Sequence, residues 1–244
     1  MKKMEQYSLQ QRISDSPEAK LRDIVTDMLY EDIVNLRIAP GTKLNVNQLA
    51  LSLGISRTPV AEAIANLQAR GFVVNKPGHS GSYVLDLNLV DMTDLYRVRS
   101  AIESEAAALC AFNADEQTIH ELTLLADAFR ESVVNRDIQG MKDTDLPFHR
   151  LIVSSCGNPY LAQLYEVILP KLTMYQSSML NFIANGDTNT NPWILKVTFN
   201  HSSVVSAIKL RMPELARQAM RDHVDSSLSF TTTSVQSADA FKFI

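Results

Sequence analysis

Four side chains of the types that bind divalent metal ions recur in the C-terminal half of this 244-residue chain: Asp145, His149, His201 and His223. Asp145 and His149 are four residues apart, a spacing that places two side chains on one face of a continuous helix. His201 and His223 fall in the apolar stripes of two further helices, so all four side chains are expected to face inward. Burying a carboxylate and three imidazoles is costly unless they bind one another or a cation. We therefore predict a divalent metal site, with zinc as the first expectation and nickel, manganese or iron as alternatives.

The members of this set also have simpler explanations. A single histidine is more often a core or surface residue with ordinary hydrogen bonds, as we expect for His120, and only the combination favours a metal. Pro147 lies between Asp145 and His149, and a proline inside a helix removes a hydrogen bond and kinks the chain. If the helix instead begins at Asp145, that residue is an N-cap and the proline lies harmlessly in the first turn. Asp145 is therefore a candidate cap, a candidate ligand, or both.

A second set of residues, in the N-terminal part, has the pattern of a nucleic-acid contact. Two short helices are predicted at 47–53 and 56–70, and the tight turn between them contains Gly54, which is typical of a helix-turn-helix. Ser56 can cap the second helix, which leaves Arg57 at the helix N-terminus, where a recognition helix presents side chains to base edges. The alternative is that Arg57 is only a solvated residue at the start of a helix.

Two β-rich runs, 71–76 and 82–85, flank a turn that contains proline and glycine, so a hairpin follows the helix pair. The tip of this hairpin could enter an adjacent minor groove. The further DNA-binding candidates lie on the second helix or on the hairpin: Thr58, Asn66, Arg70, Lys76, His79 and Gly81.

The elements that must position these residues are mostly helical. An amphipathic helix is predicted at 17–36, and six helical segments follow residue 88, at 89–112, 115–136, 140–156, 158–185, 192–210 and 213–229. The fold class is therefore mainly α, with an N-terminal winged helix-turn-helix and a C-terminal antiparallel bundle of about six α-helices. We expect a mobile N-terminal arm over 1–20, a DNA-binding domain over 21–88, a helical bundle over 89–230 and a tail over 231–244.

Composition excludes several classes of protein. With 45% hydrophobic residues the chain can bury a core, and it has neither an N-terminal signal segment nor an apolar stretch long enough for a membrane, so we expect a cytoplasmic protein. Cys110 and Cys156 form no CxxC pair, which argues against a disulfide framework or a cysteine zinc site. Residues 1–88 carry ten Lys/Arg against nine Asp/Glu, a net charge of +1, whereas residues 89–244 carry thirteen against eighteen, a net of −5. Only the N-terminal part is therefore suited to lie on DNA.

The N-terminal motifs resemble the winged helix of GntR-family transcription regulators. The resemblance covers about residues 21–85 and is strongest in Leu53-Gly-Ile-Ser-Arg-Thr-Pro-Val60, followed by Glu62-Ala-Ile64 and Gly71-Phe-Val73. One departure is Ala61, where the family usually has an arginine that contacts DNA. The resemblance therefore implies that Arg57 and the wing carry more of the affinity here, or that the operator differs.

The C-terminal motifs resemble the FCD effector domain of the FadR subfamily, with a helix count closer to its shorter VanR-like branch. The pattern includes Leu95-Tyr-Arg-Val-Arg99, Ile102-Glu103, the Asp145-x3-His149 pair and the later histidines. In metal-binding members an aspartate and three histidines hold an ion that an organic acid also coordinates, which implies Asp145, His149, His201 and His223 as ligands. Arg99 matches an arginine near the ligand pocket, and its alternative role is an ion pair with Glu103 one turn on.

The leading hypothesis is a homodimeric regulator that binds a double-stranded DNA operator and responds to a small organic acid at or near the metal. A repressor is expected rather than an activator. Two alternatives use the same ligands. The chain could be a sensor for which the metal ion itself is the signal, or a metal-dependent hydrolase, although it has no HExxH-type motif or motif-borne general base.

Overall fold

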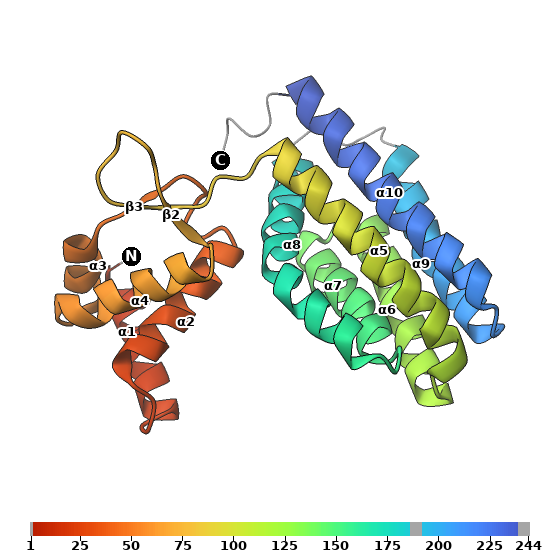
Figure 1. Cartoon of the computed structure of the whole chain (residues 1–244), viewed down its shortest axis with the longest axis horizontal. Coiled ribbons are helices and arrows are strands. Elements are labelled where there is room, and N and C mark those ends of the chain that lie inside the picture. Colours follow the sequence, from red (N-terminus) through yellow and green to blue (C-terminus); the bar gives the residue numbers. More distant parts are fainter. Residues whose placement is uncertain (1, 186–191, 239–244) are drawn as a thin grey trace. The chain divides into compact units, whose positions relative to one another are not determined.

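The chain divides into two compact units after Leu87 (Figure 1). Its structure, a computed structural model, describes residues 2–185 and 192–238. The first unit contains four helices and three short strands, in the order α1 (Lys2–Asp15), α2 (Leu21–Val34), β1 (Lys43–Leu44), α3 (Val46–Leu53), α4 (Arg57–Ala69), β2 (Val73–Asn75) and β3 (Ser82–Val84). The second contains α5 (Leu89–Asn113), α6 (Glu116–Asn135), α7 (Ile138–Ser154), α8 (Pro159–Asn185), α9 (Pro192–Lys209) and α10 (Pro213–Ala238).

The helix-turn-helix consists of α3 and α4. The side chain of Asn45 accepts hydrogen bonds from the backbone of α3 and so begins this helix, and Gly54 ends it in a left-handed conformation, φ 71°. Ser56 occupies the N-cap position of α4, but its side chain makes no capping hydrogen bond. The buried face of α4 packs against α2 through Val60, Ala63, Ile64 and Leu67. This packing leaves the opposite face of α4 exposed.

The three strands form one antiparallel sheet in the order β1-β3-β2. β2 and β3 are the predicted hairpin, and Val73 pairs with Val84. β1 pairs with β3 through Lys43 and Leu44, and two residues are too few for the alternating pattern that reveals a strand in a sequence.

The prediction of a mobile arm over residues 1–20 is wrong for residues 2–15, which form α1. Leu9 is buried, and the guanidinium of Arg12 donates to both carboxylate oxygens of Glu31 on α2. α1 also contacts α3. The sequence of this helix is mostly polar and has no long apolar stripe, so the pattern did not indicate it; among the side chains that the structure describes, Leu9 and Arg12 attach it.

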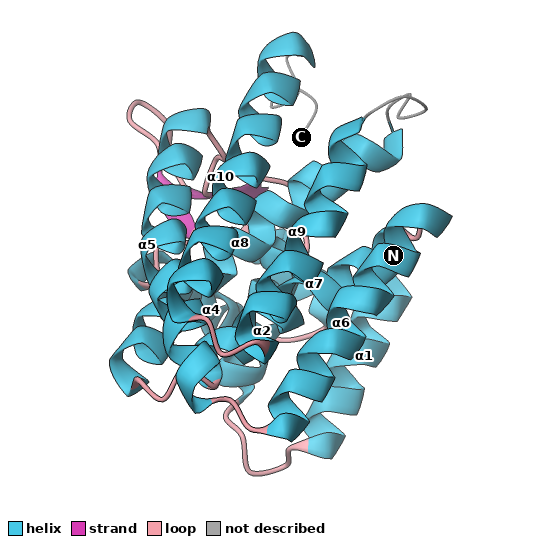
Figure 2. Cartoon of the chain, turned by 90° about the vertical axis from the view of Figure 1, so that its right-hand side faces the viewer, coloured by secondary structure: helices cyan, strands magenta, loops and turns pink. Residues whose placement is uncertain are grey.

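The second unit is a bundle of six helices among the described residues (Figure 2). α10 packs against α5 and α9, α6 packs against α7 and α9, and α7 also contacts α5 and α8. The predicted fold class is thus confirmed: a mainly helical protein with an N-terminal winged helix and a C-terminal helical domain. No helix in the described ranges is both long enough and apolar enough to cross a membrane.

The tail predicted to begin at residue 231 is wrong for its first part, because α10 continues to Ala238. Phe230 is buried beside Phe129 and Leu180, and Thr231 is buried as well. The hydroxyl of Thr231 donates to the backbone oxygen of Ser227, one turn earlier, so this threonine satisfies its polar group within the helix. Residues 239–244 lie outside the described part of the chain.

Candidate metal centre and nucleic-acid interface

Three helices bring the four predicted ligands together in the interior of the second unit. Asp145 and His149 lie one turn apart on α7, His201 lies on α9 and His223 on α10. The histidines are 0–1% exposed and Asp145 is 9% exposed. Each side chain offers one ligand atom, and these four atoms all lie within 4.8 Å of one another.

His149 is at the centre of this cluster. Its Nε2 lies 3.1 Å from Nε2 of His223, 3.4 Å from Nε2 of His201 and 3.8 Å from Oδ1 of Asp145. Nε2 of His201 is also 3.3 Å from Asp145 Oδ1. Metal bonds of about 2.1 Å would separate neighbouring ligand atoms by about 3.0 Å in an octahedron and about 3.4 Å in a tetrahedron. The four separations of 3.1–3.8 Å are close to these values, and the ligand types suit a single divalent ion.

Pro147 does not begin a helix. α7 runs without a break from Ile138, and its N-cap is Asp137, whose side chain accepts from the backbone N–H of Gly140. Asp145 therefore lies inside the helix, and the prediction that it caps a helix beginning there is wrong. Pro147 is exposed, and because proline has no N–H the carbonyl of Asp143 lacks its usual helical donor.

Two further side chains hold the cluster in place. Nδ1 of His149 lies 2.8 Å from Oε2 of Glu103 on α5, and Nε2 of Gln176 on α8 donates to Oδ2 of Asp145 at 2.6 Å. The sequence analysis did not assign either residue to the metal site. Both lie on other helices than the residues they contact, so no spacing in the chain indicates the contacts.

Arg99 and Glu103 form a buried ion pair on α5. Nε of Arg99 donates to Oε1 of Glu103 at 2.8 Å, and the two side chains are 5% and 0% exposed. Nη2 of Arg99 is buried and has no hydrogen-bond partner within the described ranges. The ion-pair alternative for Arg99 is therefore present in the structure, and it leaves part of the guanidinium available to an anion.

Burial and neighbouring charges set the protonation of these groups. Burial lowers the pKa of His201, and burial beside His201 and His149 lowers that of His223 well below its usual value, so both imidazoles are neutral near pH 7. Burial opposes ionisation of Asp145, but the hydrogen bond with His201 and the charges of His149, His201 and Arg99 together outweigh it and hold the pKa below its ordinary range. For Glu103, burial is likewise outweighed, here by the combined charges and hydrogen bonds of Arg99 and His149, and the pKa is lowered to about 2. Neutral imidazoles and an ionised carboxylate are the forms that bind metal.

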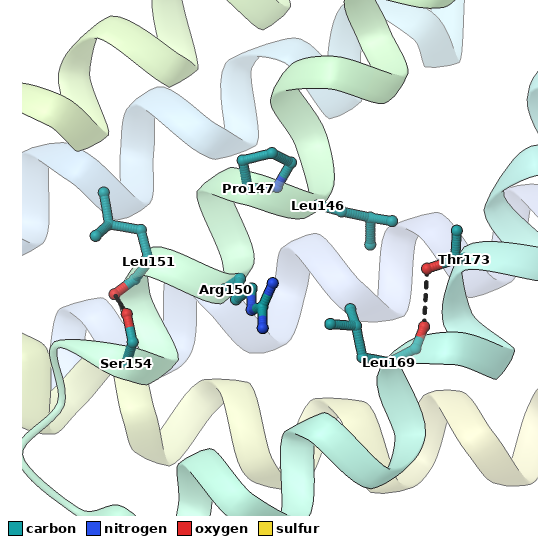
Figure 3. A pocket seen from close by; sticks show the side chains of 7 residues that line it. All are labelled: Leu146, Pro147, Arg150, Leu151, Ser154, Leu169 and Thr173. Atoms are coloured by element: carbon teal, nitrogen blue, oxygen red, sulfur yellow. Dashed lines mark hydrogen bonds between the residues drawn. The ribbon is translucent and has the colours of Figure 1, made fainter. Parts of the chain in front are cut away.

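An open groove with a volume of about 510 Å³ lies between α7 and α8. Figure 3 shows the side chains that line it. Its lining residues are Leu146, Pro147, Arg150, Leu151, Ser154, Leu169 and Thr173. No cluster residue lines it, so the groove is separate from the candidate metal site.

Some of the predicted DNA-binding side chains are exposed, and others already contact neighbouring residues. Arg57, Thr58 and Asn66 are exposed on α4, and the guanidinium of Arg57 makes one long hydrogen bond, 3.4 Å, to Asn47. Ala61 is exposed on the same helix. These residues lie on the exposed side of α4 within the first unit.

The remaining candidates have other contacts or lie at the tip of the wing. The guanidinium of Arg70 lies over the ring of Tyr30, 4.4 Å from its centroid, and Lys76 pairs with Asp86 at 2.7 Å. His79 and Gly81 are exposed in the loop between β2 and β3. Gly81 has φ 103°, a conformation that favours glycine.

Both parts of the chain match known protein families. Residues 21–84 match the bacterial regulatory proteins of the gntR family, and residues 94–226 match the FCD domain. An uncharacterized HTH-type transcriptional regulator, YdhC of Bacillus subtilis, is 28% identical over 203 residues, which are 81% of this chain and 84% of that protein. A probable D-xylose utilization operon transcriptional repressor of Paenarthrobacter nicotinovorans is 26% identical over 216 residues, 88% of this chain and 91% of that protein.

Solved structures show the same fold. McbR/YncC of E. coli superposes with a TM-score of 0.70 at 20% identity, covering 88% of this chain and 98% of that one. A putative GntR transcriptional regulator of Rhodococcus sp. RHA1 gives a TM-score of 0.66 at 19% identity, covering 87% and 97% of the two chains.

Proposed function

Because the chain belongs to the GntR family of bacterial regulatory proteins, with an FCD domain after its winged helix, we propose that it is a metal-dependent, acid-responsive repressor. In this proposal a small organic acid binds at or near a divalent ion, zinc first, and changes the affinity for an operator. The chain is a transcriptional regulator and not an enzyme, which excludes the hydrolase alternative. The proposal includes the VanR-like branch of the FadR subfamily, action as a homodimer and a place in the cytoplasm.

The observation that carries the proposal is the convergence of four buried ligand atoms. Three imidazole nitrogens and one carboxylate oxygen within 4.8 Å would be a costly arrangement without a cation to bind them. Asp145, His149, His201 and His223 would hold the ion, which would supply a positive charge for a carboxylate ligand.

Arg99 supports an acid as the effector. Its Nη2 is a buried donor without a partner in the described part of the chain, and a carboxylate is the group that a guanidinium binds best. The ion pair with Glu103 uses Nε and so leaves this donor available.

α8 offers a route from the cluster to the start of the second unit. Gln176 donates to Asp145, and the neighbouring Tyr175 hydroxyl accepts from the backbone N–H of Asn88 at 3.3 Å and lies 2.9 Å from Asp91 Oδ2. Asn88 is the first residue of the second unit and the N-cap of α5. A shift of α8 on ligand binding would therefore reach the point where the chain leaves the DNA-binding unit. For this to regulate, the ligand must bind one arrangement more tightly than another.

DNA binding by the first unit follows from its family. We propose that Arg57, Thr58 and Asn66 on the exposed side of α4 contact bases or phosphates, and that His79 and Gly81 at the wing tip approach the minor groove. Arg70 and Lys76 remain candidates for DNA contacts, although Arg70 already contacts Tyr30 and Lys76 already pairs with Asp86. Two copies would read a two-fold operator.

A metal sensor remains the second candidate function, because the same four residues would serve it. The rate at which the ion exchanges distinguishes the regulator from the metal sensor. A resident ion stays bound through dialysis, whereas a sensed ion exchanges over the range of its cellular concentration. The regulator proposal expects the acid, and not the ion, to change operator affinity.

The test combines metal analysis with calorimetry. Protein purified without added metal is analysed for metal content and titrated with a panel of small carboxylic acids, next to the His201→Ala/His223→Ala double variant and a His120→Ala control, whose histidine is exposed on α6. We expect about one divalent ion per chain and acid binding in the wild type and the control only. Wild-type protein that holds no added zinc, or that binds acids as the double variant does, would refute the proposal.

A further inference from the structure

Glu103 makes two contacts that together connect α5 to the centre of the cluster. Its Oε1 accepts from Arg99 Nε at 2.8 Å, and its Oε2 lies 2.8 Å from Nδ1 of His149. Glu103 and His149 are both 0% exposed, so neither contact competes with water. The carboxylate therefore has one oxygen for the guanidinium and the other for the imidazole.

His149 is distinguished from the other two histidines by this contact. The Nδ1 atoms of all three histidines are buried and make no hydrogen bond of standard geometry within the described ranges, but only that of His149 has a carboxylate oxygen within ion-pair distance, at 2.8 Å. The carboxylate beside His201, that of Asp145, lies 3.3 Å from Nε2 and not at Nδ1. His149, by contrast, has a carboxylate at Nδ1, and its Nε2 is within 3.8 Å of the ligand atom of each of the other three residues.

We propose that Glu103 is a positioning residue that keeps the proton of His149 on Nδ1 and so presents the free electron pair of Nε2 to the metal. This inference rests on the proposed function, because it assigns a role within the same metal site. An ionised carboxylate can only accept a hydrogen bond, so a neutral His149 that bonds to Glu103 across this 2.8 Å separation donates through Nδ1 and leaves Nε2 unprotonated. A neutral histidine with the opposite tautomer would point an N–H at the centre of the cluster and could not bind an ion there.

Arg99 contributes by keeping the carboxylate in place. Without the guanidinium, Glu103 could turn toward another donor, since a buried carboxylate needs a charged partner. Arg99 thus acts on Glu103, and Glu103 acts on His149; of these three residues, His149 alone would contact the ion.

The first experiment measures zinc affinity by competition with a chromophoric chelator. Wild-type protein is compared with Glu103→Gln and with Glu105→Gln, a matched change two residues along α5 at a half-exposed glutamate that pairs with Arg217. Residues in this supporting position typically contribute 10- to 100-fold to metal affinity. We expect a loss of about that size in Glu103→Gln and no loss in Glu105→Gln. Equal zinc affinity of Glu103→Gln and wild type would overturn the inference.

The second experiment uses the wild-type protein, so it does not depend on whether a variant folds. Nitrogen-15 chemical shifts of the wild-type histidines, measured near pH 7 with and without zinc, report which ring nitrogen is protonated. We expect His149 to be protonated on Nδ1 in both conditions. A His149 that carries its proton on Nε2 before zinc is added would refute the role of Glu103, even if Glu103→Gln is too unstable to study.

The outcomes also separate this inference from the proposed function. Failure of the wild type itself to bind zinc would refute the metal site and the inference with it. Tight zinc binding by the wild type, with unchanged binding in Glu103→Gln, would refute only the role of Glu103.

Discussion

Replacing His223 by leucine is expected to stabilise the metal-free protein while abolishing its response to zinc. His223 is 1% exposed, and its Nδ1 has no hydrogen-bond partner among the described residues. A buried polar group without a partner costs about 1–3 kcal/mol. Leucine has a similar volume and no polar atom, so His223→Leu removes this cost without opening a large cavity.

The expected gain is about 1–2 kcal/mol, because His149 also loses the contact between its Nε2 and that of His223, 3.1 Å away. For a unit of this size, Asn88–Phe243, this corresponds to a rise of about 2–8 °C in Tm. Zinc at about 100 times its Kd would stabilise the wild type by about 2.7 kcal/mol but would not stabilise a variant that lacks one ligand. The order of stability should therefore reverse between chelator and zinc.

Thermal unfolding followed by circular dichroism, in chelator and in zinc, tests this reversal. His120→Leu is the matched control, since His120 is exposed on α6, and it should behave as the wild type does in both conditions. The reasoning would be refuted if His223→Leu melted below the wild type in chelator and gained as much as the wild type from zinc.

Three other predictions follow from the same contacts. Arg57→Ala should weaken operator binding in a fluorescence anisotropy titration, and if Arg57 contacts a phosphate it should also reduce the slope of log affinity against log salt by about 1. Arg130→Ala, at an exposed residue of α6, should change neither the operator affinity nor this slope. Tyr175→Phe should leave zinc affinity within about twofold of the wild type. It should reduce the effect of the acid on operator affinity, because the hydroxyl that contacts Asn88 is lost. The control Tyr160→Phe, at an exposed residue of the same helix, should retain the full effect. Acidification should destabilise the metal-free protein: the pKa of His223 lies well below the value of about 6.5 in an unfolded chain, so below pH 6.5 the unfolded state takes up a proton that the folded state does not. Urea unfolding should show a loss of about 1.4 kcal/mol for this histidine at pH 5.5 relative to pH 7.5, and equal stability at the two pH values would contradict the burial argument.

The helices of the second unit were predictable because a long amphipathic helix repeats its apolar residues many times. The exceptions lie at the two ends of the chain. α1 is attached by Leu9 and by the ion pair of Arg12, and the end of α10 by Phe230 and Thr231, so in each case a few tertiary contacts decide the structure. Local sequence carries little information about such contacts.

The candidate metal site was predictable for a different reason. Asp145 and His149 are one turn apart, and His201 and His223 are polar residues in apolar stripes, so four ligand types on inward faces could be recognised without coordinates. The supporting shell was not predictable. Whether a helix is regular through a proline, and whether Glu103 and Gln176 reach the cluster, depends on how helices distant in sequence pack.

The distribution of charge limits how such a regulator can work. The residues up to Leu87 carry a net charge of +1 and those from Asn88 onward a net of −5, since no charged residue lies at the boundary itself. The acidic unit gains nothing by approaching DNA, so in the proposed regulator a ligand bound in its interior would act on the placement of the basic unit rather than by direct contact with DNA. A buried cluster of ionisable groups lowers the stability of the metal-free bundle, and a ligand that satisfies them can release that free energy as a change of arrangement. The Tyr175 contact with Asn88 is where such a change would first reach the connecting chain.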